Sequence, residues 1–151
     1  MNINDRLARG FLAGIVGSIA MNIFNLISYY LGIAELRFLD WAAVVIYGTK
    51  PENIFETIFA QLIQIIFASI LGIIFAYLIP QIGSINYYLR GWLYGASTWF
   101  LLYVISLLYK IELTIPLHVD TAASDFLGSS IYGLVLAKTL FWLDNKVKID
   151  T

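Results

Sequence analysis

Long apolar stretches alternate with short polar breaks along the chain. Uncharged runs extend over residues 10–34, 57–89 and 91–109, and a helix needs about 20 mostly apolar residues to cross the hydrocarbon core of a bilayer. A fourth apolar stretch carries Asp125 and Lys138 near its ends, where a lysine can extend to the membrane surface. The pattern predicts a single all-α membrane domain with four transmembrane helices, at about 10–33, 54–80, 89–109 and 121–143.

A shorter apolar segment lies between the first two predicted spans. The stretch LRFLDWAAVVIYG, residues 36–48, is too short to cross a bilayer and has Arg37, Asp40 and Lys50 in or beside it. It predicts a short interfacial or re-entrant helix at about 36–48 that ends at Gly48. Such a helix could lie flat on the membrane, or it could cap an opening in the bundle.

Two segments of the chain recur later in the same order. RGFLAG at 9–14 returns as RGWLYG at 90–95, an offset of 81, and SILGIIFA at 69–76 returns as SIYGLVLA at 130–137, an offset of 61. Two ordered matches favour a duplication over chance similarity between apolar helices. We therefore expect two tandem helical hairpins, at about 9–80 and 90–143, related by an axis along the membrane normal.

Small and polar residues recur at every fourth position in the predicted spans. This spacing keeps them on one helix face, where small residues let membrane helices pack closely. The packing positions that we expect are Gly10, Gly14, Ser18, Gly72, Gly91, Gly95, Ser129 and Gly133. An amide group facing lipid would lack hydrogen-bond partners, so four amide residues should face the interior and bond across helices: Asn22, Asn25, Gln61 and Gln64.

Asp125 has two interpretations. It could form a cation or proton site in a pocket open to the outer surface, because ionisable residues within spans are often functional. It could instead reach water near that surface, or cap the start of the fourth helix. The one histidine, His118, lies near Glu112 and Asp120 but lacks the ligand spacing of a metal site. We expect neither a metal nor a cofactor.

Composition and charge also indicate a membrane protein. Of the 151 residues, 60% are hydrophobic and 13% are charged, whereas soluble domains contain about 25% charged residues. The first span lacks the features of a cleaved signal peptide. A cytoplasmic N-terminus places most lysine and arginine residues inside, as the positive-inside rule requires. We expect a multi-pass protein of the bacterial cytoplasmic membrane with both termini in the cytoplasm.

Several kinds of chemistry find no support in the sequence. The chain has no cysteine, which excludes disulfides, thiolate catalysis and cysteine-bound metals. It has no phosphate-binding loop and no metalloprotease motif. No basic patch is present, so nucleic-acid binding is not expected. We therefore expect a protein that is not an enzyme, with an intramembrane enzyme acting on lipid as a third-ranked alternative.

The segments RGWLYGASTWF (90–100) and LGSSIYGLVLA (127–137) resemble small bacterial four-helix membrane proteins of unknown function, which have glycine-rich third and fourth helices. The resemblance implies an architecture without an assigned activity. We expect a self-associating or accessory subunit that contacts the lipid bilayer and either forms a homo-oligomer or binds a partner membrane protein. The alternative is a minimal transporter or channel for a cation or small solute, with Asn22, Asn25, Gln61, Gln64 and Asp125 lining its path. A water-filled cavity from Asp125 to Asn22 would favour transport.

Overall fold

The computed structural model describes residues 4–82, 86–111, 114 and 118–149, and this part of the chain contains helices and no strand. The elements are α1 (Arg6–Tyr30), α2 (Phe38–Tyr47), α3 (Ile54–Leu78), the 3-10 turn η1 (Ile79–Gln81), α4 (Tyr87–Leu108) and α5 (Val119–Ile149). All of the α-helices except α2 are long and apolar enough to cross a membrane. The predicted fold class is confirmed, including the short helix between the first two spans.

The helix ends follow local capping groups. Helix α1 begins at Arg6 rather than at residue 10, because the Asp5 side chain accepts a hydrogen bond from the backbone N–H of Leu7. Helix α3 begins after Asn53, which caps it by accepting from the Glu56 N–H. Helix α5 continues to Ile149 rather than ending at 143. Charged residues end an apolar pattern without ending a helix, so α1 starts before its predicted span and α5 continues beyond its predicted span.

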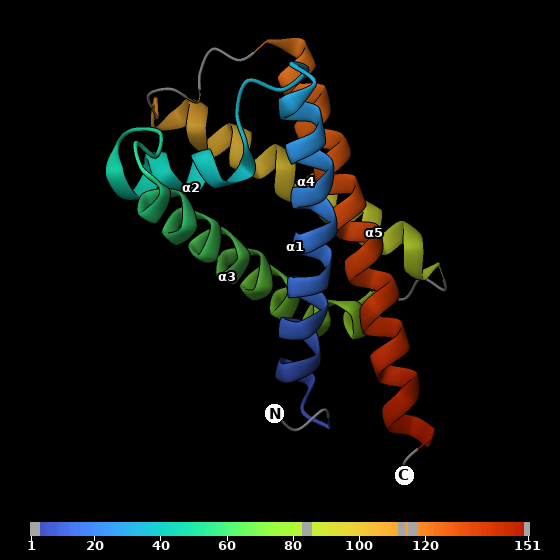
Figure 1. Ribbon diagram of the computed structural model, residues 1–151. Coiled ribbons are helices and arrows are strands. Elements are labelled where there is room, and N and C mark those ends of the chain that lie inside the picture. The colour runs from blue at the N-terminus through green and yellow to red at the C-terminus, as the bar shows by residue number, and fades with distance from the viewer. Residues whose placement is uncertain (1–3, 83–85, 112–113, 115–117, 150–151) are drawn as a thin grey trace.

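The helices are arranged around a central pair, α1 and α5, which run side by side (Figure 1). Helix α3 packs on α1, and α4 packs on α5. Helices α3 and α4 slope away from the central pair and do not form a packed pair with each other. Both termini lie at one end of the bundle, and α2 lies toward the other end, beside the start of α3 (Figure 1). We call these the terminal end and the α2 end.

Small residues occupy the α1–α3 and α4–α5 contacts. A Cβ atom added at Gly10 would lie 2.8 Å from the Cα of Ile73, and one at Gly14 would lie 2.6 Å from the Cα of Ser69. At the other contact, a Cβ added at Gly133 would meet the backbone carbonyl of Gly91. All eight packing positions named from the sequence are buried. At the glycines, the two helix backbones therefore approach as closely as the absence of a side chain allows.

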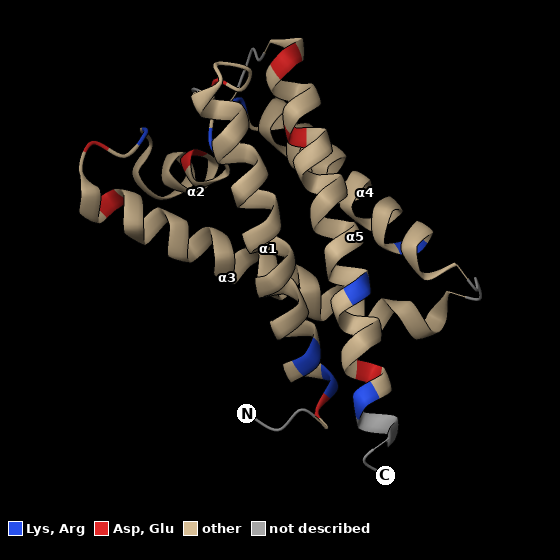
Figure 2. Ribbon diagram, turned by 45° about the vertical axis from the view of Figure 1, so that its right-hand side comes forward, with Lys and Arg blue, Asp and Glu red and all other residues tan. Residues whose placement is uncertain are grey.

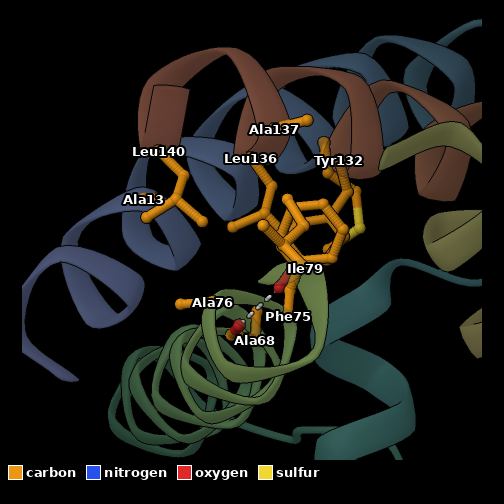
Figure 3. Close-up of a cluster of buried hydrophobic side chains, with 10 residues drawn as sticks. Ala13, Ala68, Phe75, Ala76, Ile79, Tyr132, Leu136, Ala137 and Leu140 are labelled. Atoms are coloured by element: carbon orange, nitrogen blue, oxygen red, sulfur yellow. Dashed lines mark hydrogen bonds between the residues drawn. The ribbon is translucent and has the colours of Figure 1, made fainter. Parts of the chain in front are cut away.

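The core of the protein lies between α1, α3 and α5 (Figure 3). Its largest fully buried side chains include Phe75, Leu136 and Leu140. The Tyr132 hydroxyl donates a 2.6 Å hydrogen bond to the carbonyl of Ala68, which ties α5 to α3 across this core. Because Ala68 has no long side chain, the ring of Tyr132 can reach that carbonyl.

Candidate functional site: a pocket beneath α2

A pocket of about 400 Å³ lies between α3 and α4. Helix α2 covers it, and residues of α1 and α5 complete its wall. This volume lies in the range of small-molecule sites, about 300–1,000 Å³. Most of the lining is aliphatic or aromatic, and it includes Trp41, Ile46, Phe67, Leu71, Trp99 and Leu102. We call this the α2 pocket.

Asn25 of α1 positions the start of α2. Its side-chain oxygen accepts a 2.8 Å hydrogen bond from the backbone N–H of Phe38, and its amide nitrogen lies 3.5 Å from the carbonyl of Leu36. Asn25 is only 1% exposed. Because a buried amide must find partners, these bonds hold the beginning of α2 against α1.

A second set of bonds closes the first turn of α2. The Asp40 carboxylate accepts from the Arg37 backbone N–H at 2.8 Å and from the Arg37 guanidinium at 2.7 Å. The same guanidinium lies over the ring of Tyr29, 5.3 Å from its centroid. The hydrogen bond to Asp40 raises the pKa of Arg37 above its ordinary value. In the sequence these two charges only flank an apolar run, whereas in the structure they form the cap of the helix together.

Asp125 lies at the polar wall of the α2 pocket. One carboxylate oxygen accepts a 2.9 Å hydrogen bond from the Tyr103 hydroxyl, and the other lies 3.5 Å from the Asn25 amide nitrogen. Asp125 is 1% exposed and lies well inside α5, which begins at Val119. The interpretation in which Asp125 reaches water or caps the fourth helix is therefore wrong. No ion pair among the described residues includes it.

The other polar residues form a separate cluster around Gln64. The Gln64 side-chain oxygen accepts from the Asn22 amide at 2.8 Å, from the Gln61 amide at 3.1 Å and from the Ser18 hydroxyl at 3.4 Å. The Asn22 amide also donates to the Ser18 carbonyl at 2.8 Å. The bond between Asn22 and Gln64 crosses from α1 to α3, whereas the bond from Gln61 stays within α3.

The structure therefore divides the five polar candidates into two groups. Asn25 and Asp125 belong to the network at α2, and Asn22, Gln61 and Gln64 form the second cluster. Only Gln64 and Asp125 line the α2 pocket. His118 pairs with Glu35 instead of approaching either group, and Glu112 lies outside the described residues.

The aromatic part of the pocket was not identified from the sequence. The ring centroid of Tyr103 lies 5.4 Å from that of Trp41 and 4.9 Å from that of Trp99. The rings of Trp99 and Phe126 meet edge to face at 5.3 Å. Trp99 and Tyr103 are four residues apart and so share one face of α4. That spacing was the available signal, but it does not show that α2 lies opposite.

The comparisons with known proteins give one match. The model of a family described as a family of unknown function (DUF6789) matches residues 4–151. No curated protein and no solved structure gives a significant match.

Proposed function

The chain belongs to the family of unknown function DUF6789, and we propose that it is a non-enzymatic membrane protein that binds a lipid-soluble, apolar molecule in the α2 pocket. Its four long apolar helices are those of an integral membrane protein. An acyl or isoprenoid chain, or an apolar ring of similar size, has the chemistry that this pocket would accept. The following contacts support the proposal.

The main support is that the apolar lining of the pocket continues onto the outer surface of the helices. Val45, Phe67 and Ile105 line the pocket, and they are also 72%, 45% and 44% exposed. In a bilayer these side chains would face the hydrocarbon chains. An apolar ligand could then pass from the lipid into the pocket without crossing water, and it would lose no hydration on entry.

The same lining argues against a route for ions. A cation that entered a mostly apolar pocket would lose hydration without a matching set of ligands. Gln64 and Asp125 are the two polar candidates in the wall, and both already have hydrogen-bond partners. Asn22 and Gln61 lie outside the lining. We therefore place apolar binding ahead of the transport hypothesis.

The proposal can be tested by photolabelling in lipid vesicles with an alkyl diazirine probe, followed by peptide mapping. We expect labels to concentrate on pocket residues such as Trp41 and Leu102, and excess unlabelled hexadecane to compete. Ala42→Phe adds a ring inside the pocket, while Ala123→Phe adds the same ring to an exposed position on α5. The first variant should lower pocket labelling several-fold, and the second should leave it unchanged.

The opposite result would be equally clear. Labelling spread evenly over the lipid-facing helices, and unaffected by Ala42→Phe, would show that the α2 pocket holds no ligand.

We also propose that the protein acts as a self-associating or accessory subunit that delivers or retains its ligand within the cytoplasmic membrane. The proposed orientation places both termini in the cytoplasm. Figure 2 supports it, because most Lys and Arg residues lie toward the terminal end and most Asp and Glu residues lie toward the α2 end. The basic residues in question are Arg6, Arg9, Arg90, Lys138 and Lys146. Protease protection of tags at either terminus in oriented vesicles would test this orientation.

A further inference from the structure

A second pocket, of about 250 Å³, lies near the terminal end between the start of α4 and α5. Its lining consists of Asn86, Tyr87, Tyr88, Lys138 and Phe141. We propose that this pocket binds the phosphate-bearing headgroup of an anionic phospholipid. The proposal is independent of the α2 pocket and its ligand.

Lys138 supplies the charge that an anionic headgroup needs. It is exposed on α5, it lines the pocket, and it forms no ion pair with the described carboxylates. Asp144, further along the same helix, is already paired with Arg9 at 2.7 Å. An incoming phosphate would therefore meet a lysine that is not engaged by any of the described carboxylates.

The charges around the pocket are predominantly positive. Asp144 of α5, Arg90 of α4 and Arg6 and Arg9 of α1 all act electrostatically on the Tyr87 hydroxyl, Asp144 most strongly, and Asp144 is the one carboxylate among the described residues that does so. Arg90 also donates to the carbonyl of Ile79 at 3.1 Å, which holds it beside the end of α3. These charges would attract an anionic headgroup to this end of the bundle.

Aromatic rings give the pocket the character of a membrane interface. The rings of Tyr87 and Phe141 pack with their centroids 5.2 Å apart and form one wall. Tyr88 and Phe141 are 55% and 49% exposed. Tyrosine and other aromatic rings concentrate at the level of lipid headgroups, and basic pockets between transmembrane helices at the cytoplasmic side bind acidic headgroups. The acyl chains would then lie along the apolar outer faces of α4 and α5.

The test compares dioleoylphosphatidylglycerol with dioleoylphosphatidylcholine by native mass spectrometry of the protein released from mixed micelles. Lys138→Gln removes the pocket charge. Lys146→Gln removes an equal charge from the same helix, where Lys146 lies 4.4 Å above the ring of Trp142 and outside the pocket. We expect wild-type protein and Lys146→Gln to retain phosphatidylglycerol several-fold more than phosphatidylcholine. Lys138→Gln should lose that preference, and Lys138→Arg should keep it.

Three results would overturn the proposal. The first is wild-type protein without a preference for phosphatidylglycerol. The second is an equal loss of the phosphatidylglycerol preference in Lys138→Gln and Lys146→Gln, which would indicate diffuse attraction of the lipid to the whole terminal end. The third is Lys138-dependent binding of soluble glycerol 1-phosphate as tight as that of the lipid, which would assign the pocket to a free phosphate. Unchanged helix content by circular dichroism would show that each variant is folded.

Discussion

Replacing Gly14 with alanine should push α1 away from α3. A Cβ atom at this position would lie 2.6 Å from the Cα of Ser69 and 2.9 Å from the carbonyl oxygen of Ala68. Both are backbone atoms, so no rotation of a side chain can relieve the contact. Carbon atoms pack at about 3.5–4.0 Å. The two helices must therefore separate by roughly 1 Å at this crossing, and Gly72, whose own Cβ would meet the Gly14 Cα at 2.7 Å, lies in the same contact.

Gly17→Ala provides a matched control on the same helix. The nearest atoms to a Cβ at Gly17 are Cδ2 of the Tyr132 ring, at 3.0 Å, and the Tyr132 carbonyl oxygen, at 3.1 Å, so the overlap is milder than the 2.6 Å contact at Gly14. Both substitutions gain about 1 kcal/mol of helix propensity, which cancels when the variants are compared. Overpacking costs about 1–3 kcal/mol. Both variants are overpacked, Gly14→Ala more severely, so we expect Gly14→Ala to be less stable than Gly17→Ala by about 1 kcal/mol.

The free energy of unfolding can be measured in detergent micelles by titration with sodium dodecyl sulfate, followed by far-ultraviolet circular dichroism. A Gly14→Ala variant as stable as Gly17→Ala would refute the reasoning, because it would mean that the close α1–α3 approach does not contribute to stability.

Three further experiments test the parts that surround the pockets. Asn25→Leu removes the acceptor for the Phe38 N–H; it should lower the free energy of unfolding by about 1–3 kcal/mol, and hydrogen exchange in α2 should accelerate. Gly48→Ala should cost about 1–2 kcal/mol because Gly48 has a φ of +78°, and the end of α2 should exchange faster while α3 does not. A double-mutant cycle of Arg9→Gln and Asp144→Asn should give a coupling of about 1 kcal/mol that weakens in salt; zero coupling would contradict the ion pair.

The spans and the short helix could be predicted because apolar length is a local property of the chain. Residues 36–48 are too few to cross a bilayer whatever surrounds them, and Phe38–Tyr47 forms the predicted helix. The ends of α1 and α5 were less predictable, because Asp5 caps one helix and charged residues continue the other. The tandem duplication stays a prediction from the sequence.

The hydrogen-bond partners of the polar residues depend on how each helix is rotated about its own axis, and the sequence does not specify that rotation. A period of four placed Asn22 and Asn25 on one face of α1, but it could not assign Asn22 to Gln64 of α3 and Asn25 to Asp125 of α5. One pair joins α1 to α3, and the other joins α1 to α5. The shared helix face therefore predicts one common polar path. The observed contacts instead place Asn22 and Asn25 in two separate clusters.

The α2 pocket arises from a relation between helices that no single segment encodes. Glycines specify that α1 touches α3 and that α4 touches α5, yet they leave the angle between α3 and α4 open. Trp99 and Tyr103 have the spacing of an ordinary lipid-facing stripe on α4, and they become a pocket wall only because Trp41 of α2 lies against Tyr103. Asn25 determines that placement by holding the Phe38 N–H. A variant that releases α2 should therefore weaken binding of an apolar ligand even though Asn25 itself does not line the pocket.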